Sequence, residues 1–484
     1  MGQSDASSEA PAKAMGRRLL TPAAVAILVV GIAMVGIAHA ADGDVPSWSI
    51  TTTPNPSASN NDLASVSCMS ATFCVAVGGS VGSGTPTSLT LVETWDGTTW
   101  TVVPSLTPTE GGALGTVSCT SPTFCMAIGS TSSNQGLAES WNGVDWSVLQ
   151  TTPLSAGQVS CTSPTFCMAV GADYSSGPST PTTTTATWNG AVWTTVSSPD
   201  PSTTVNVLAG VSCTSPSFCV AVGTYHNPAD AANDSLMLSW DGTEWSVDSS
   251  PNAPNSILNF PQTVSCVSPS FCVAIGMSKL IDSSGSVTIG TETQTWNGTS
   301  WSLLVRPNQG PILGVSCVAS SACTAVGTDN NPLVESWDGS GWSVTPSATP
   351  PGDRSLLSSV SCAPSLFCMA VGGSTTGTAE ATLAETGSTP TPTPMPPTTT
   401  TVTDSPTTTS STSTTSTLVA VARAGTSGSA SFGATPASSS SLAFTGPGRG
   451  LRWTTLIGSV LLVVGGALLV VAELPRRRRR HLVC

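Results

Sequence analysis

Three regularities of the 484-residue sequence predict an all-β fold, a β-propeller of seven four-stranded blades. A Val-Ser-Cys unit recurs seven times, and successive copies lie 42 to 53 residues apart. A second cysteine always follows the first after five intervening residues, and a Trp-Asp/Asn-Gly-x-x-Trp element ends six of the units. Four-stranded units with a period of about 40 to 55 residues are typical of propellers.

Each unit reads as four short strands. The first ends at Val-Ser-Cys, and the second is the Cys-Val-Ala-Val-Gly run, which is rich in β-branched residues. The third strand ends at the first tryptophan, as at Trp95, and the fourth begins near the second, as at Trp100. Asp96-Gly97 predicts a two-residue type I′ turn that places Trp95 opposite Thr98. Both tryptophans are then expected on one face of the sheet.

The seventh unit predicts how the ring closes. Gly387 stands where its first tryptophan is expected, and its fourth strand is missing. The segment Trp48–Pro54 matches Trp146–Pro153, which carries the fourth strand of the second unit. The N-terminal strand is therefore expected to complete the last blade, which closes the ring and leaves no open edge. The predicted propeller spans residues 46–387.

The paired cysteines are predicted to form disulfides between the first and second strands of each unit, because adjacent antiparallel strands bring their Cβ atoms within range. A Cys₄ zinc site is the alternative, but a ring of seven pairs would leave one pair unmatched. The expected disulfides are Cys68–Cys74, Cys119–Cys125, Cys161–Cys167, Cys213–Cys219, Cys266–Cys272, Cys317–Cys323 and Cys362–Cys368.

The N-terminal segment 1–40 has the pattern of a secretory signal peptide. Arg17-Arg18 precede an apolar run from Leu19 to Ile37, and Ala38-His39-Ala40 is a small-x-small cleavage site. Either Met1 or Met15 could start the translated chain, and an uncleaved anchor is the alternative to cleavage. Export also favours oxidised cysteines.

The C-terminal segments predict a stalk and an anchor. Residues 388–441 are almost wholly Thr, Ser, Pro, Ala and Gly, which cannot bury a core and predicts a disordered stalk open to O-glycosylation. The apolar run 454–472 is long enough for one transmembrane helix, and the basic tail 476–484 is expected in the cytoplasm.

The pentapeptide Leu442-Ala443-Phe444-Thr445-Gly446, followed by the apolar run and the basic tail, resembles a cell-wall sorting signal. Ala443 stands where the common sortase motif has proline, and in this it resembles the variant of high-GC Gram-positive bacteria. The resemblance implies cleavage between Thr445 and Gly446 and attachment of Thr445 to peptidoglycan. Plain membrane anchoring by the single span is the alternative.

Glycine pairs such as Gly78-Gly79 and Gly372-Gly373, followed later by the tryptophan hairpin, resemble kelch-type propeller repeats. Most units have one glycine at this place, so the resemblance concerns the architecture. It implies a propeller and no particular ligand.

Charge and composition limit the classes of partner and of chemistry expected for the propeller. Between Ala41 and Gly387 there are 23 acidic and three basic residues, a net charge of −20, which would repel nucleic acid. His226 is the one histidine of this region, and Glu93, Glu139, Glu335 and Glu385 recur two residues before the first tryptophan position, which favours a structural role. The loop acids Asp173, Asp230, Asp234 and Asp282 lack calcium-loop spacing. We therefore predict no catalytic, metal-binding or cofactor-binding residue.

The predicted function is a non-enzymatic binding or adhesion module on the cell surface, with an unknown extracellular carbohydrate or protein as partner. The variable loops after the second strand of each unit are the expected binding region, and the longest are Thr224–Ser235, which contains His226, and Met277–Glu292. The tryptophans could stack on sugars, although their fixed place in each unit favours packing between blades. Two alternatives remain, an extracellular hydrolase or lyase acting on polysaccharide and a structural wall component without a ligand. Acids that converge with Arg306 or Arg354 at one mouth of the ring would favour the enzyme.

Overall fold

A computed structural model describes residues 48–149, 157–229, 232–307 and 310–389, and these residues form 28 β-strands. The signal segment, the sorting motif, the apolar run 454–472 and the basic tail lie outside the described residues. Within the described part, no helix is long and apolar enough to cross a membrane.

Five sheets are separate and have four antiparallel strands each. The first two are β2 (Asn61–Ser70), β3 (Phe73–Val81), β4 (Ser88–Trp95) and β5 (Trp100–Val102), then β6 (Gly112–Ser121), β7 (Phe124–Thr131), β8 (Gly136–Trp141) and β9 (Trp146–Leu149). The third is β10 (Gly157–Ser163), β11 (Phe166–Asp173), β12 (Thr182–Trp188) and β13 (Trp193–Val196). The fourth is β22 (Ile312–Ala319), β23 (Ala322–Asp329), β24 (Asn331–Trp337) and β25 (Trp342–Thr345). The fifth is β26 (Arg354–Cys362), β27 (Phe367–Thr376) and β28 (Ala379–Ser388), with β1 (Ser49–Thr51) at its edge.

The remaining eight strands form one continuous sheet. Its halves are β14 (Asn206–Ser215), β15 (Phe218–Asn227), β16 (Ala232–Trp240) and β17 (Trp245–Asp248), and β18 (Ser256–Ser268), β19 (Phe271–Ile281), β20 (Val287–Trp296) and β21 (Trp301–Pro307). One parallel bridge, Asn233 to Leu258, joins them. The prediction of seven separate blades is therefore wrong. Five blades are separate sheets, because the long strands β16 and β18 meet and merge two repeats.

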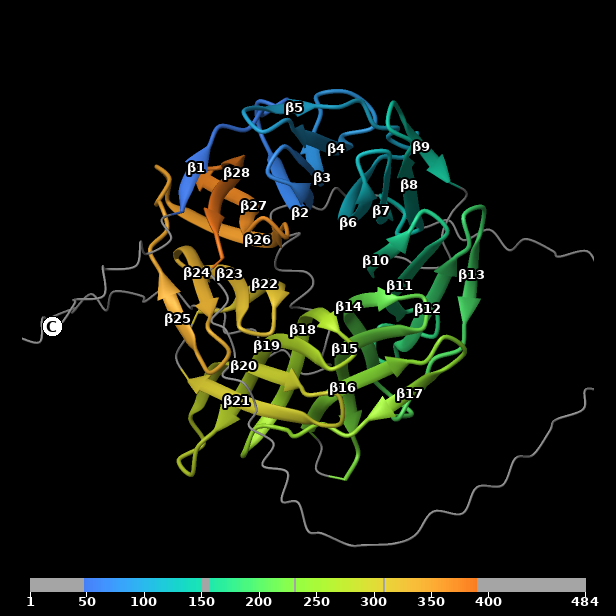
Figure 1. The fold of residues 1–484 in the computed structure, drawn as a ribbon, viewed down its shortest axis with the longest axis vertical. Helices are drawn as coiled ribbons and strands as arrows, with labels where there is room; N and C mark the ends of the chain where they lie inside the picture. The colour runs from blue at the N-terminus through green and yellow to red at the C-terminus, as the bar shows by residue number, and fades with distance from the viewer. Residues whose placement is uncertain (1–47, 150–156, 230–231, 308–309, 390–484) are drawn as a thin grey trace, which may run out of the picture. The chain divides into compact units, whose positions relative to one another are not determined.

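The sheets follow one another around a central axis (Figure 1). The innermost strand of each repeat contacts that of the next, in the order β2, β6, β10, β14, β18, β22 and β26, and β26 contacts β2. Apolar side chains fill the space between neighbouring sheets, as where Val75 and Val77 of β3 pack with Leu114 and Val117 of β6. This arrangement is a β-propeller, as the repeat pattern of the sequence predicts.

The predicted closure is confirmed. Strand β1 pairs with β28 through Ser49–Thr386, Ile50–Glu385 and Thr51–Ala384. A Cβ atom at Gly387 would lie 2.5 Å from atoms of the Trp48 ring. Gly387 therefore replaces the usual tryptophan so that the ring of Trp48 can lie against the backbone there. The propeller extends two residues past its predicted end at 387, because Ser388 ends β28 and the buried Thr389 donates its amide to the Leu366 carbonyl at 3.0 Å.

The serine of each Val-Ser-Cys unit links neighbouring repeats. Its hydroxyl oxygen accepts a hydrogen bond from the cysteine amide of the following repeat, for example Cys119 to Ser67 at 3.0 Å. Cys68 donates to Ser361 at 2.9 Å, which continues the series across the closure. The other donor–acceptor pairs are Cys161–Ser118, Cys213–Ser160, Cys266–Ser212, Cys317–Ser265 and Cys362–Ser316. We call these seven hydrogen bonds the serine ring.

The cysteines form seven disulfides, each between directly opposed residues of the first two strands, with Cα atoms 4.0 Å apart. The amide of each cysteine that enters the serine ring thus belongs to a residue that is also cross-linked within its own repeat. The motif therefore combines a covalent link inside a repeat with a hydrogen bond between repeats.

The tryptophan hairpin differs from the prediction. Trp95 lies directly opposite Trp100, and the loop between them has four residues, not two. Asp96 determines this loop, because its Oδ1 accepts hydrogen bonds from the amides of Thr98 and Thr99, both at 2.8 Å, and Gly97 has a φ of +101°. The two rings do share one face, with centroids 5.7 Å apart. Trp95 Nε1 donates to the Ala71 carbonyl at 3.0 Å, which ties this hairpin to the cysteine turn.

Candidate functional site

The two segments expected to bind a ligand are mostly strand. In Thr224–Ser235, strands β15 and β16 stay paired out to Asn227 and Ala232. In Met277–Glu292, strands β19 and β20 stay paired out to Ile281 and Val287. Their description as loops was wrong, because cross-strand pairing continues past the point where other repeats turn. We call these two segments the extended hairpins.

The extended hairpins belong to the same eight-stranded sheet. The bridge from Asn233 to Leu258 joins β16 to β18, and β18 in turn pairs with β19. The Asn259 side chain strengthens this junction, since its Nδ2 donates to the Asn233 carbonyl at 3.3 Å and its Oδ1 accepts the Ala253 amide at 3.0 Å. The structure therefore brings the two predicted segments together on one sheet.

The second extended hairpin has an ordered tip. Asp282 Oδ1 accepts hydrogen bonds from the amides of Ser284 at 2.8 Å and Ser286 at 2.9 Å. Hydrogen bonds from the hydroxyl of Ser284 and from the Ser286 amide lower the pKa of Asp282 below its usual value. Gly285 follows with a φ of +82°, which suits glycine. Asp282 thus shapes the tip through hydrogen bonds within the hairpin.

One face of this hairpin is apolar and exposed. Lys279 pairs with Ile289, and Ile281 pairs with Val287, so these four side chains share a face. Ile281, Val287 and Ile289 are 38%, 52% and 48% exposed. We call these four residues the apolar face. A further exposed residue, Ile257, lies on the neighbouring strand β18.

The apolar face is exposed because the next repeat is shorter. Lower on the same side of β19, Val273 and Ile275 pack against residues of β22 and β23. Strand β23 ends at Asp329, six residues after its second cysteine, whereas β19 continues three residues beyond the equivalent Ser278. Side chains on this side of β19 beyond Ser278 therefore have no neighbouring sheet among the described residues to cover them.

The histidine and three of the four loop acids singled out in the sequence lie in strands and turns where they form hydrogen bonds within the protein. His226 lies in β15, where its Nδ1 is 3.1 Å from Oδ1 of Asn233, so it is a strand residue and not a loop histidine. Asp234 accepts a hydrogen bond from Asn227 at 2.8 Å. Asp173 caps a turn by accepting the Ser175 amide at 2.8 Å, and Asp230 lies outside the described residues.

The four recurring glutamates are fully buried at interfaces between repeats. Burial raises the pKa of Glu93 to about 8 and the pKa values of Glu139 and Glu385 to about 7. The nearby backbone of Leu106 lowers the pKa of Glu139 in part, but no hydrogen bond of ordinary geometry joins Leu106 to this carboxyl group. Both carboxyl oxygens of Glu93 and of Glu139 have no hydrogen-bond partner among the described residues.

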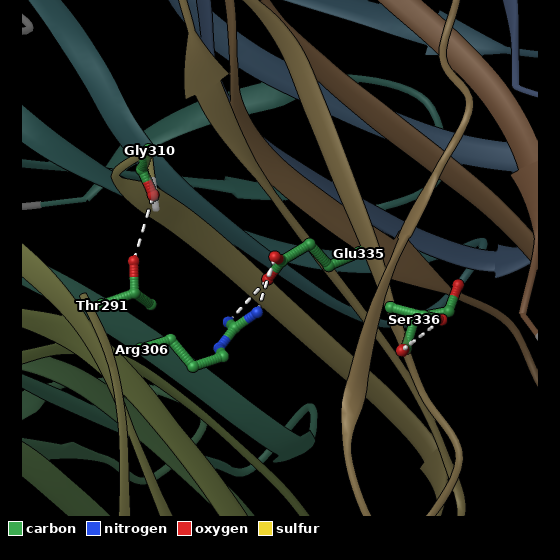
Figure 2. A network of polar contacts seen from close by, with 6 residues as sticks. Thr291, Arg306, Gly310, Glu335 and Ser336 are labelled. Atoms are coloured by element: carbon green, nitrogen blue, oxygen red, sulfur yellow. Dashed lines mark hydrogen bonds and ion pairs between the residues drawn. The ribbon is translucent and has the colours of Figure 1, made fainter. Parts of the chain in front are cut away.

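Glu335 differs from the other three glutamates because it forms an ion pair with Arg306. The two terminal guanidinium nitrogens of Arg306 donate to its two oxygens at 2.6 and 2.7 Å, as Figure 2 shows. The guanidinium carbon also lies 5.8 Å from the ring centroid of Trp342. Arg306 comes from β21 and Glu335 from β24, so this pair joins neighbouring sheets. Arg306 is thereby placed at an interface between sheets and not with acids at a mouth of the ring, and Arg354 is exposed at the start of β26.

Comparison with known proteins identifies no family. No family model and no curated protein matches this sequence. A solved structure of YCF48 bound to D1 peptide has 14% identity and a TM-score of 0.43 over 70% of this chain and 94% of that chain. YCF48 from Cyanidioschyzon merolae has 13% identity and a TM-score of 0.43, over 70% and 98% of the two chains. The WD40 β-propeller domain of Doa1 has 13% identity and a TM-score of 0.43, over 69% and 94%. Similarities at these identities and TM-scores assign neither a family nor a ligand.

Proposed function

We propose that this protein is a cell-surface recognition module whose propeller binds a partner protein through the apolar face of its second extended hairpin. The observation that carries the proposal is the exposure of Ile281, Val287 and Ile289 side by side on an ordered hairpin. Contiguous apolar surface of this kind marks interaction sites in soluble domains.

The chemistry of the apolar face favours polypeptide over carbohydrate. Three of its four side chains are aliphatic and none is aromatic, whereas sugars are bound by aromatic stacking and by convergent polar groups. Lys279 adds one positive charge in a region that carries a net charge of −20. A segment with apolar side chains and a carboxylate would therefore complement this face, and the acidic surroundings would disfavour more acidic competitors.

A selection experiment tests the partner class. The full chain is immobilised under oxidising conditions and offered a random peptide library, and a glycan panel is tested in parallel. The proposal predicts enriched peptides with apolar residues next to Asp or Glu. Their affinity should fall at least tenfold in the triple variant Ile281→Thr, Val287→Thr, Ile289→Thr, and also in Lys279→Glu.

A matched control separates this face from general loss of apolar surface. Val144→Thr and Val192→Thr change exposed valines in the tryptophan hairpins of two other sheets and should leave peptide affinity unchanged. Binding of a glycan that survives the triple variant would contradict the proposal, and so would peptides that bind the triple variant as well as the original protein.

Surface display is supported by the order of segments, with a signal pattern at 1–40, the Ser/Thr/Pro stalk from 388 to 441, and the motif 442–446 before an apolar run and a basic tail. We include sortase attachment to peptidoglycan in the proposal. Thr445→Ala should then move the protein from the cell-wall fraction to the membrane fraction. A wall fraction that is unchanged in this variant would show that the motif is not used.

A further inference from the structure

A pocket of about 410 Å³ lies at the outer edge of the eight-stranded sheet. Its walls come from Asp248 at the end of β17, from Ser249 to Pro251 after it, and from the β20–β21 hairpin with Trp296 and Trp301. The two indole rings are 5.5 Å apart. The pocket therefore combines one carboxylate, several hydroxyls and a pair of aromatic rings, and it shares no residue with the apolar face.

Comparison among the repeats shows why the pocket is open here. Asp248 pairs with Met237, three residues before the first tryptophan of its repeat. The same register position is held by Leu149 and Val196, which pack on the cluster containing the tryptophans of the following repeat. The other residues at this position are Thr51, Val103, Leu304 and Thr345. Asp248 is the one charged residue in this series, in which four of the other six repeats carry an aliphatic side chain and two carry threonine.

Only one of the two carboxylate oxygens of Asp248 accepts a hydrogen bond among the described residues. Its Oδ1 accepts a hydrogen bond from the Ser239 hydroxyl at 3.0 Å. Its Oδ2 is buried and accepts no hydrogen bond of ordinary geometry among the described residues, whereas the unpartnered Nε1 of Trp301 is common to the second tryptophan of every repeat. Burial raises the pKa of Asp248, while Ser239 and the nearby Trp301 indole lower it in part. A donor from a ligand would supply the partner that Oδ2 lacks.

We propose that this Asp248 pocket binds a cationic group, an ammonium or a guanidinium, which donates to the Asp248 carboxylate and lies against the partly exposed indole of Trp296. A carboxylate beside aromatic rings stabilises a cation through charge-assisted hydrogen bonding and cation–π attraction together. The net charge of −20 between Ala41 and Gly387 also raises the local concentration of cations. The cation belongs to a free amine or to a basic side chain of a partner, and the two sources share this chemistry.

Ligand-observed NMR on the full chain tests the site. The probes are N-acetyl-lysine methylamide, its uncharged counterpart N-acetyl-norleucine methylamide, n-butylammonium and N-acetylglucosamine. The lysine derivative should bind at least tenfold more tightly than the norleucine derivative, and more weakly as salt is raised. If butylammonium binds as well as the lysine derivative, the site takes free amines. If only the lysine derivative binds, it takes a basic side chain.

Variants assign the binding to this pocket. Asp248→Asn keeps the shape and removes the charge, and it should weaken cation binding at least tenfold. Glu244→Gln, which removes an exposed charge from the same repeat, should leave binding unchanged. Asp248→Val installs the residue that β13 carries at this position, so it should abolish binding while the protein stays folded.

Three results would overturn the inference. The first is equal affinity for the lysine and norleucine derivatives. The second is N-acetylglucosamine binding that persists in Asp248→Asn, which would make the pocket a sugar site. The third is no binding of any probe together with a lower unfolding temperature in Asp248→Asn, which would give Asp248 the role of accepting the Trp301 indole.

Discussion

Removal of the Arg306 guanidinium should destabilise the propeller by an amount that depends on pH. In Arg306→Met the side-chain stem is kept, but the carboxylate of Glu335, which is 1% exposed, loses both of its hydrogen bonds. Its surroundings then resemble those of Glu93, a fully buried glutamate that has no hydrogen-bond partner in the described part of the chain and whose pKa is raised by burial from 4.5 to about 8. The position of Glu93 in β4 is equivalent to that of Glu335 in β24, so the comparison is direct.

The magnitude follows from that comparison. A glutamate with a pKa of about 8 in the folded state and 4.5 in the unfolded state keeps its proton in the folded state where the unfolded chain has lost it. The cost is therefore small near pH 4.5 and grows as pH rises, to about 4 kcal/mol near pH 7.5 and about 1 kcal/mol near pH 5. The higher value agrees with the roughly 3–5 kcal/mol expected when one partner of a buried ion pair is removed.

Urea unfolding of the oxidised full chain, followed by tryptophan fluorescence at both pH values, measures this difference. Arg306→Met should shift the unfolding midpoint strongly near pH 7.5 and weakly near pH 5. The double variant Arg306→Met, Glu335→Gln should recover most of the loss at the higher pH, because no buried carboxyl remains. Equal losses at both pH values, or no recovery in the double variant, would refute the reasoning.

Three further predictions concern other parts of the ring. Because the pKa of Glu93 is raised, the free energy of unfolding should fall as pH rises from about 4.5 to about 8. The stability gained by Glu93→Gln should therefore grow across this window, and parallel curves of unfolding free energy against pH would contradict the prediction. Gly387→Ala places a Cβ atom 2.5 Å from the rigid Trp48 ring and should lower the free energy of unfolding in urea by about 1–3 kcal/mol. The control Gly341→Ala adds a Cβ atom in open space and should cost far less, so equal effects would argue against close packing of Trp48 on Gly387. Ser67→Ala removes one acceptor of the serine ring and should lower the free energy of unfolding by about 1–3 kcal/mol. Hydrogen exchange of the Cys119 amide should become faster, and unchanged exchange would show that this hydrogen bond contributes little.

The repeat pattern predicts much of the fold because the same residues recur at the same register. The cysteine pairs, the shared face of the tryptophans and the completion of the last sheet by β1 all follow from positions within one unit. The four-residue hairpin loop was missed because Asp-Gly also suits a two-residue turn, and the side-chain hydrogen bonds of Asp96 decide between them.

Features that depend on neighbouring repeats were not predictable in the same way. The serine of Val-Ser-Cys reads as an ordinary strand residue, since its donor lies in the following repeat. The bridge between Asn233 and Leu258 depends on how far β16 and β18 extend, which sequence patterns define poorly. Asp248 could have been noticed by aligning the seven units, because it is the one acid at its register position.

Site-specific photo-crosslinking on intact cells tests the recognition role most directly. A benzoyl-phenylalanine replaces Val287 in the apolar face or, as the control, Val144 in a tryptophan hairpin, and both positions are well exposed. The proposed function predicts a discrete protein adduct from position 287 that is lost when Lys279→Glu is added, and none from position 144. An absence of adducts at position 287, or the same adducts from both positions, would contradict a specific binding surface on the extended hairpin.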